Sequence, residues 1–256
     1  ISTLPVRMSR IKKILISQPA PLMANPYTEV AEKYQVELDY KQFIRVETVA
    51  TKEFRQQRIN PLDYTAIIFT SRTAILHFFT LMKEMRITMP DTMKYYCSSE
   101  KSAPYLQKFV NYRKRKVFFS PTGRTEDLVK VIVKHKGEKY LLPVAEEHNA
   151  KLSDLLTEAG IDYTKSVMYR TIPRELELEK PLPYDMIIFF SPVGITSLFE
   201  NVPDFKQEEM IIATVGPKTA QRAEELGLRV DIKSTGSRQD PPMPELLHNY
   251  LAEQEG

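Results

Sequence analysis

The chain has 256 residues, of which 42% are hydrophobic and 27% are charged, a balance typical of soluble globular proteins. Its net charge of +3 is too small to indicate a nucleic-acid partner, and no apolar run approaches the roughly 20 residues that cross a bilayer. The single cysteine, Cys97, excludes an internal disulfide and fits a reducing cytoplasm. The four histidines are scattered and none lies near Cys97, so we expect no metal site.

The opening residues, Ile1–Arg10, lack the apolar centre of a signal peptide, so we expect no secretory signal in them. The chain starts with Ile rather than Met, and the sequence leaves its native N-terminus open. The one basic run, Arg113–Lys116, directly precedes an apolar stretch. We interpret it as a solvated turn rather than a patch that binds a polyanion.

Strands and helices are predicted to alternate along the first half of the chain. Asn25 followed by Pro26 is a helix start, because Asn caps free N–H groups and Pro fits the first turn. Strands or extended segments are expected at Lys12–Ser17, Val36–Val46, Thr65–Phe69, Lys94–Cys97, Val117–Phe119 and Tyr140–Pro143. Helices are expected at Pro26–Tyr34, Arg72–Met85 (with Ile75, Leu76, Phe79 and Met82 on its apolar face), Glu100–Phe109, from about Leu128 to Gly137, and Asn149–Ala159.

The second half continues the alternation after an extended segment at Val167–Arg170 and a charged, proline-punctuated linker at Pro173–Pro183. Strands are expected at 186–190, 211–215 and 230–232, and helices at 193–200, 217–226 and from the last proline-rich loop to Ala252. Regular alternation of strands and helices indicates an α/β fold with parallel sheets.

Two parts of the chain repeat each other. Tyr64–Ile75 and Tyr184–Ile195 share Tyr, Ile, Ile, Phe, Ser and Ile at matching positions, and each is an apolar strand, a hydroxyl residue and a helical segment. A weaker repeat relates the strand of Lys13–Ile16 to that of Lys139–Leu142. The chain therefore contains two similar α/β domains. The repeats alone leave open whether the first segment belongs with the middle or with the last part of the chain.

The predicted helix starts are candidates for an anion-binding site. Ser71 and Ser191 are expected to cap helices beyond the carboxyl ends of strands, where free N–H groups and the positive end of the helix dipole face a ligand. The junctions supply Ser71, Arg72, Lys101, Ser102, Ser191, Lys218 and Thr219. Several such sites suit a ligand with many carboxylates. The alternative is that these residues are ordinary caps and surface charges.

Motifs of several enzyme classes are missing. The sequence contains no Gly-x-Ser-x-Gly, no Cys paired with His, no Walker motif and no Gly-x-Gly-x-x-Gly. With only 8 glycines, a cradle for a dinucleotide or a triphosphate is not expected. An enzyme with this sequence would work mainly by holding the shape of its substrate.

An ordered set of motifs resembles the uroporphyrinogen-III synthase family. The set consists of Ile68-Phe69-Thr70-Ser71, then Phe189-Phe190-Ser191-Pro192-x-Gly194, then Val215-Gly216-Pro217-x-Thr219-Ala220 with Gly227 and Leu228 after it. Each motif alone is loose, but their order is specific and runs over nearly the whole chain. One departure is Ser99–Ala103, where the family usually has Gly-x-x-Thr-Ala.

The resemblance implies a cytoplasmic, cofactor-free enzyme, expected to be a monomer without nucleic-acid or membrane partners. Such an enzyme is a lyase that converts hydroxymethylbilane, a linear tetrapyrrole with eight carboxylates, into uroporphyrinogen III, with loss of water, ring closure and inversion of ring D. The resemblance also implies two α/β domains joined by two antiparallel linker strands, with the active site in the cleft. The expected domains are residues 1–42 with 174–256, and residues 51–166, with linkers at 43–50 and 167–173. Strand Lys12–Ser17 should then share a sheet with strand Met186–Phe190.

The resemblance also assigns roles to individual residues. Tyr169 is implied as the catalytic residue, because it is expected on a linker that faces the cleft and a phenol can donate a hydrogen bond to a leaving hydroxyl. By pattern alone, Tyr169 would be a packing residue. Substrate binding is implied for Thr70, Ser71, Arg72, Lys101, Ser102, Ser191, Pro192, Gly194, Gly216, Lys218 and Thr219. The competing hypothesis is a non-catalytic two-domain hinge protein that binds a small polycarboxylate or another anion.

Overall fold

The computed structural model describes residues 11–255. Residues 1–10, where no signal peptide is expected, and Gly256 lie outside the described part. The chain divides into two compact units: unit 1 combines the chain up to Arg45 with residues from Ile172 onward, and unit 2 is Val46–Thr171. The chain crosses between them in strands β3 (Ile44–Thr48) and β8 (Tyr163–Pro173). Among the described helices, none is long and apolar enough to cross a membrane.

Unit 1 is built on a five-stranded sheet in the order β11-β10-β9-β1-β2. Its strands are β1 (Lys13–Ile16), β2 (Glu37–Tyr40), β9 (Met186–Phe189), β10 (Ile211–Val215) and β11 (Ile232–Ser234), and all paired neighbours are parallel. β1 pairs with β9 in the register Ile14 to Met186, so the predicted sharing of one sheet by these strands is confirmed.

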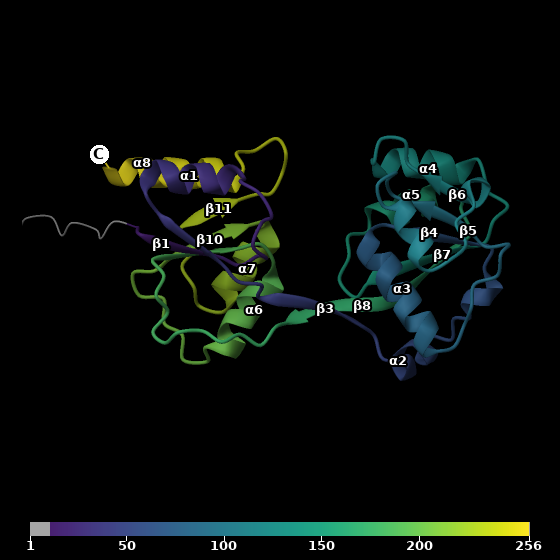
Figure 1. Cartoon of the computed structure of the whole chain (residues 1–256), viewed down its shortest axis with the longest axis horizontal. Coiled ribbons are helices and arrows are strands. Elements are labelled where there is room, and N and C mark those ends of the chain that lie inside the picture. Colours follow the sequence, from purple (N-terminus) through teal and green to yellow (C-terminus); the bar gives the residue numbers. More distant parts are fainter. Residues whose placement is uncertain (1–10, 256) are drawn as a thin grey trace, which may run out of the picture. The chain divides into compact units, whose positions relative to one another are not determined.

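Helices cover both faces of this sheet (Figure 1). Alternate strand residues point to opposite faces, so Ile14 and Ile16 pack with α1 (Pro26–Tyr34) and α8 (Met243–Glu255). Leu15 and Ile187 pack on the other face with α6 (Pro192–Asn201) and α7 (Pro217–Glu225). The inner strands β1, β9 and β10 are therefore apolar on both sides, as expected for a buried parallel sheet.

Unit 2 has a six-stranded sheet in the order β3-β8-β7-β4-β5-β6. Besides β3 and β8, its strands are β4 (Ala66–Phe69), β5 (Lys94–Cys97), β6 (Val117–Phe119) and β7 (Tyr140–Ala145). The strands from β8 to β6 pair in parallel. Ile67 and Phe69 pack against α2 (Thr51–Gln56), α3 (Arg72–Glu84) and the 3-10 helix η2 (Ala103–Lys108), whereas Ala66 and Ile68 pack against α4 (Thr125–Val133) and α5 (Lys151–Glu158). Two short 3-10 turns complete the unit, η1 (Pro61–Asp63) and η3 (Lys114–Lys116).

β3 and β8 form the predicted antiparallel pair. The Val49 amide donates to the Met168 carbonyl at 2.9 Å, and the Arg174 amide donates to the Phe43 carbonyl at 3.0 Å. The residue numbers of the two strands therefore run in opposite directions, so the strands are antiparallel. The expected α/β class, with two helix-covered sheets and two antiparallel connecting strands, is confirmed.

Several predicted elements differ in detail. Residues 100–109 were expected to form an α-helix, but the structure has 3-10 helix at Ala103–Lys108, whose buried residues Ala103 and Leu106 lie three apart as that helix requires. The extended segment 36–46 is two strands in different sheets, because the chain passes from unit 1 to unit 2 within β3. Leu76, expected on the apolar face of α3, is 40% exposed.

Candidate functional site

The candidate site in unit 2 begins where β4 ends. Ser71 has extended backbone angles and caps α3, and its Oγ accepts a hydrogen bond from the Ala74 amide at 3.1 Å. That bond satisfies one of the free N–H groups at the start of the helix. Thr70 precedes it, and its carbonyl accepts a hydrogen bond from the Ser98 hydroxyl at 2.8 Å. The predicted capping role of Ser71 is thereby confirmed.

Tyr169 on β8 reaches the same point. Its side chain is 9% exposed, and the side chains of Ser71 and Thr70 lie beside its hydroxyl. Burial raises the pKa of Tyr169 above its ordinary value, and the neighbouring Ser71 and Thr70 hydroxyls offset part of that rise. The phenol therefore stays protonated at neutral pH. The sequence-predicted residues Thr70, Ser71 and Tyr169 are brought together here.

A bulge in β8 contributes to the placement of Tyr169. β7 and β8 pair regularly up to Val144 with Val167, and then Ala145 pairs with Tyr169, so that Met168 is the extra residue. In a regular strand Met168 and Tyr169 would point to opposite faces. With the bulge, both pack into the core beside α3. Bulges are known to redirect a side chain in this way.

His77 and Thr48 complete the surroundings of Tyr169 and were not predicted. The rings of His77 and Tyr169 stack, with centroids 5.3 Å apart. The Nδ1 atom of His77 lies 2.7 Å from the Thr48 hydroxyl on β3, and burial lowers the pKa of His77. A neutral imidazole with one hydrogen-bond partner supports the phenol without adding charge. His77 lies on α3 about two turns after Ser71, so its spacing from Ser71 in the sequence could have indicated that it lies near the site.

Arg170, next to Tyr169, is the centre of an ion-pair network that sequence reasoning also missed. Its guanidinium contacts Glu47 at 3.5 Å and Glu146 at 3.0 Å, and it makes a close ion pair with Glu53. The carboxylates raise the pKa of Arg170, chiefly through the hydrogen bond to Glu53. The network joins β8 to β3, α2 and the end of β7, so it holds the strand that carries Tyr169.

The second predicted helix start in unit 2 has a different geometry. Arg72 donates from Nη2 to the Lys101 carbonyl at 2.9 Å, so these two residues are adjacent. Both side chains are exposed. Ser102 is 5% exposed and makes no capping bond; its hydroxyl donates instead to the Ser99 carbonyl at 2.9 Å. Arg72 and Lys101 can receive an anion from solvent, whereas the Ser102 hydroxyl is turned inward.

In unit 1, the start of α6 repeats the arrangement of α3. Ser191 caps the helix by accepting from the Gly194 amide at 3.1 Å, and Pro192 occupies the first turn. Gly194 is buried, and an added Cβ would meet the Ser191 Oγ at 3.5 Å and the Phe189 ring at 3.6 Å. The matching geometry of Ser71 and Ser191 shows that the sequence repeat is also a structural repeat.

The start of α7 is more open. Its capping residue is Gly216, with φ of 93°, which has no side chain to satisfy the first N–H groups. Lys218 is exposed and has no ion-pair partner among the described residues, while Thr219 is 2% exposed. α6 and α7 pack side by side on the same face of the sheet (Figure 1). Free amides beside a lysine are suited to a carboxylate.

The described part of the chain contains no group of side chains suited to a metal ion. Within residues 11–255, no three His, Cys, Asp or Glu side chains lie close enough together to hold a metal ion. Cys97 is buried, and burial raises its pKa to about 12, so its thiol is not ionised at neutral pH. The groups available for chemistry at the candidate site are therefore hydroxyls, amides, an imidazole and surface cations.

Comparisons with known proteins identify related chains. The family model described as uroporphyrinogen-III synthase HemD matches residues 30–241. The crystal structure of uroporphyrinogen-III synthetase from Helicobacter pylori has 18% identity and a TM-score of 0.54, with 96% of this chain and 100% of that chain covered. A mutant uroporphyrinogen III synthase from Thermus thermophilus has 16% identity and a TM-score of 0.46 over 96% of this chain and 100% of that chain. A comparison with curated proteins gave no match.

Proposed function

Because the chain belongs to the uroporphyrinogen-III synthase family, we propose that it converts hydroxymethylbilane into uroporphyrinogen III. This reaction closes a linear tetrapyrrole with loss of water and inversion of ring D. The observation that carries the mechanistic part of the proposal is the buried Tyr169 side chain, whose hydroxyl lies beside Ser71 and Thr70 at the carboxyl end of the unit 2 sheet.

Loss of hydroxide from the hydroxymethyl carbon needs a proton donor. The C–O bond breaks, its electron pair leaves with the oxygen, and a proton from the site completes a water molecule. Ser71 already accepts the Ala74 amide, so its own hydroxyl hydrogen is available to Tyr169. In the proposed mechanism the phenol oxygen accepts from the Ser71 and Thr70 hydroxyls, which leaves the phenol hydrogen for the leaving oxygen. The cation that remains is stabilised by the pyrrole of the substrate.

Binding of the carboxylates is assigned to the helix starts. In unit 1, Lys218 with the amides at the start of α7 offers the most open anion site, and Ser191, Pro192 and Gly194 shape the start of α6. In unit 2, Arg72 and Lys101 present cations at one surface. A carboxylate at a helix start gains about 0.3–1 kcal/mol from the dipole, and more beside a cation. Eight carboxylates on one substrate make use of several such weak sites.

The reaction class follows from the same chemistry. Loss of water with ring closure makes the enzyme a lyase, and no electrons are transferred, so the proposed reaction needs no redox cofactor. We place the enzyme in the cytoplasm, where a single buried cysteine is stable, and we expect it to act as a monomer.

The test uses the isomer of the product. Freshly made hydroxymethylbilane is incubated with the protein, and the products are oxidised to porphyrins and separated by chromatography. We expect isomer III in proportion to the amount of protein, while heat-inactivated protein gives isomer I, which forms spontaneously. Isomer I alone from folded protein would refute the proposal. If that protein still bound the substrate, the result would favour a non-catalytic anion-binding role.

A further inference from the structure

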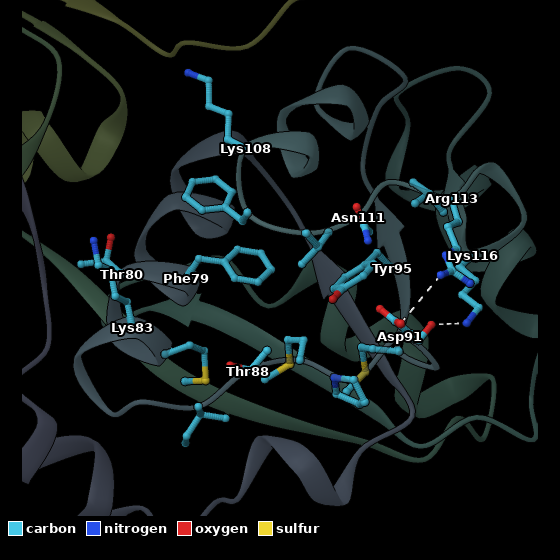
Figure 2. Close-up of a pocket in the computed structure, with 18 of the residues that line it drawn as sticks. Phe79, Thr80, Lys83, Thr88, Asp91, Tyr95, Lys108, Asn111, Arg113 and Lys116 are labelled. Atoms are coloured by element: carbon cyan, nitrogen blue, oxygen red, sulfur yellow. Dashed lines mark hydrogen bonds and ion pairs between the residues drawn. The ribbon is translucent and has the colours of Figure 1, made fainter.

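A pocket of about 810 Å³ lies in unit 2 (Figure 2). Neither Ser71 nor Tyr169 lines it. It is formed by the last turns of α3, the loop that enters β5, and the segment between η2 and β6. Ser71 and Tyr169 lie where β4 and α3 meet, at the carboxyl end of the sheet, whereas the pocket lies where β5 and β6 begin. Its volume is in the usual range for sites that bind small molecules.

The inner wall of the pocket is apolar and well packed. Phe79, Met82 and Met93 line it and are at most 9% exposed. Phe79 stacks on Phe109 with ring centroids 4.9 Å apart and planes 5° apart. Stacked rings give a wall of fixed shape, and methionines adapt to the outline of a ligand.

One polar side chain within this wall lacks a partner. Tyr95 is 5% exposed, and its ring packs against Phe79 with centroids 6.4 Å apart. Its hydroxyl makes no hydrogen bond to any residue in the described range and is not one of the fully buried polar atoms, so it is open to the pocket. Figure 2 shows Tyr95 between Phe79 and a charged group formed by Asp91, Arg113 and Lys116. The Tyr95 hydroxyl is thus a donor available to a ligand.

The charged group is positive. Arg113 makes an ion pair with Asp91 at 3.7 Å, and the ammonium of Lys116 donates to the backbone carbonyl of Asp91. Arg113 is therefore paired with a carboxylate, whereas Lys116, which is half-buried, contacts only a backbone carbonyl there. Burial, followed by the nearby Asp91, raises the pKa of Tyr95, so its hydroxyl remains a proton donor at neutral pH. The charged end of the pocket favours a negative ligand group.

We propose that this pocket binds an apolar molecule that carries one anionic group. The apolar part lies against Phe79, Met82 and Met93, and the anionic group meets Arg113, Lys116 and the Tyr95 hydroxyl. The substrate of the proposed reaction does not fit this description, since it carries eight carboxylates and the inner wall of the pocket is apolar. The pocket is therefore a second site, separate from the one that contains Tyr169.

The test compares the binding of two fluorescent probes that differ in charge. The probe 1-anilinonaphthalene-8-sulfonate is an apolar anion whose emission rises in apolar surroundings, and N-phenyl-1-naphthylamine is a similar neutral molecule. We expect the anion to bind the full chain with at least about threefold higher affinity than the neutral probe, because one exposed charge pair contributes up to about 1 kcal/mol. Equal affinities for the two probes would overturn the anionic part of the proposal.

Variants then locate the bound anion. Tyr95→Phe should weaken its binding by about twofold to tenfold, the value of one hydrogen bond. Arg113→Gln should weaken it by about threefold, and Asp91→Asn should strengthen it by a similar factor, because the repelling carboxylate is removed. Arg115→Gln is the matched control, since Arg115 is exposed in η3 and does not line the pocket.

Two further results would reject the proposal. One is an unchanged dissociation constant in both Tyr95→Phe and Arg113→Gln, each shown to be folded by circular dichroism. The other is loss of binding in Arg72→Gln, because Arg72 is a surface cation beside the candidate site and does not line this pocket. The product-isomer assay does not enter this test, so its failure and that of the proposed function are distinguishable.

Discussion

The rings of His77 and Tyr169 stack with centroids 5.3 Å apart and planes inclined by 17°. His77 comes from α3 and Tyr169 from β8, so this contact joins the helix that starts at Ser71 to the strand that carries the phenol. Thr48 holds the imidazole from a third element. The orientation of the Tyr169 hydroxyl is therefore fixed by packing before any substrate arrives, as efficient general acid catalysis requires.

Removing only the hydroxyl of Tyr169 tests its role. Tyr169→Phe keeps the ring stacked on His77, so we expect a folded protein that still forms isomer III. Turnover should fall at least about tenfold, since general acid catalysis contributes about 10²–10⁴-fold and positioning of the substrate remains. Steady-state kinetics with hydroxymethylbilane measures the change.

Tyr163→Phe is the matched control for this variant. Tyr163 lies on the same strand, but its hydroxyl contacts Thr157 at 2.7 Å and donates to the Ser153 carbonyl at 2.9 Å. We expect full turnover from it. If Tyr169→Phe also showed wild-type turnover, Tyr169 would be a packing residue.

The second prediction concerns the acid sensitivity of unit 2. Burial lowers the pKa of His77 in the folded state, so the unfolded state takes up a proton first as the pH falls below about 6.5. The neutral ring therefore contributes stability that is present above that pH and is lost as the pH falls toward the folded pKa. His77→Gln keeps a polar group near Thr48 but does not titrate.

Thermal unfolding at pH 7.5 and pH 5.5 measures this effect. The midpoint should fall more on acidification in the wild type than in His77→Gln. Equal falls in the two proteins would show that His77 does not contribute to acid sensitivity.

Much of the fold could be predicted because the relevant signals are local. The repeat of Tyr64–Ile75 in Tyr184–Ile195 marked two strands and their helices, and the structure places Ser71 and Ser191 at equivalent caps. The sheet to which the first strand belongs could not be predicted from local signals. The prediction came from the family resemblance, and the pairing of Ile14 with Met186 confirms it.

The surroundings of Tyr169 could not be predicted in the same way. The bulge at Met168 depends on the pairing of β8 with β7, and Arg170 meets carboxylates from three separate elements. No spacing within residues 167–171 encodes these contacts. η2 was assigned to the wrong helix type because the positions of Ala103 and Leu106 fit both a 3-10 helix and an α-helix, and only packing decides.

The third prediction tests why glycine precedes α7. Gly216 has φ of 93° and ψ of 142°, a conformation that residues with a Cβ avoid. An added Cβ would lie 3.8 Å from the Thr219 Oγ1, an ordinary contact, so backbone strain is the main cost. Gly216→Ala should therefore lower the free energy of unfolding by about 1–3 kcal/mol.

Urea unfolding followed by circular dichroism measures this change, with Gly137→Ala as the control. A Cβ at Gly137 meets nothing within 4 Å, and its φ lies outside the positive range. We expect that variant to equal the wild type or to gain up to about 1 kcal/mol. Equal stability of Gly216→Ala and Gly137→Ala would contradict the strain argument.

The last prediction concerns Lys218. It lies after the end of β10, is exposed, and stands beside amides that Gly216 does not cap. If it receives a substrate carboxylate, then Lys218→Ala should raise the Michaelis constant by about threefold to tenfold and change turnover less, because a charge-assisted contact to a carboxylate that does not react stabilises the bound and the transition state alike.

Salt provides a second measure of the same contact. Exposed charges are screened over about 8 Å at physiological ionic strength, so the wild-type Michaelis constant should rise with added potassium chloride. The rise should be smaller in Lys218→Ala, which has already lost one charge pair. Lys206→Ala is the control, because Lys206 is an exposed lysine of the same unit in the loop before β10, at the opposite end of that strand from Lys218. If Lys218→Ala and Lys206→Ala changed the Michaelis constant equally, Lys218 would act only through the overall charge of the protein.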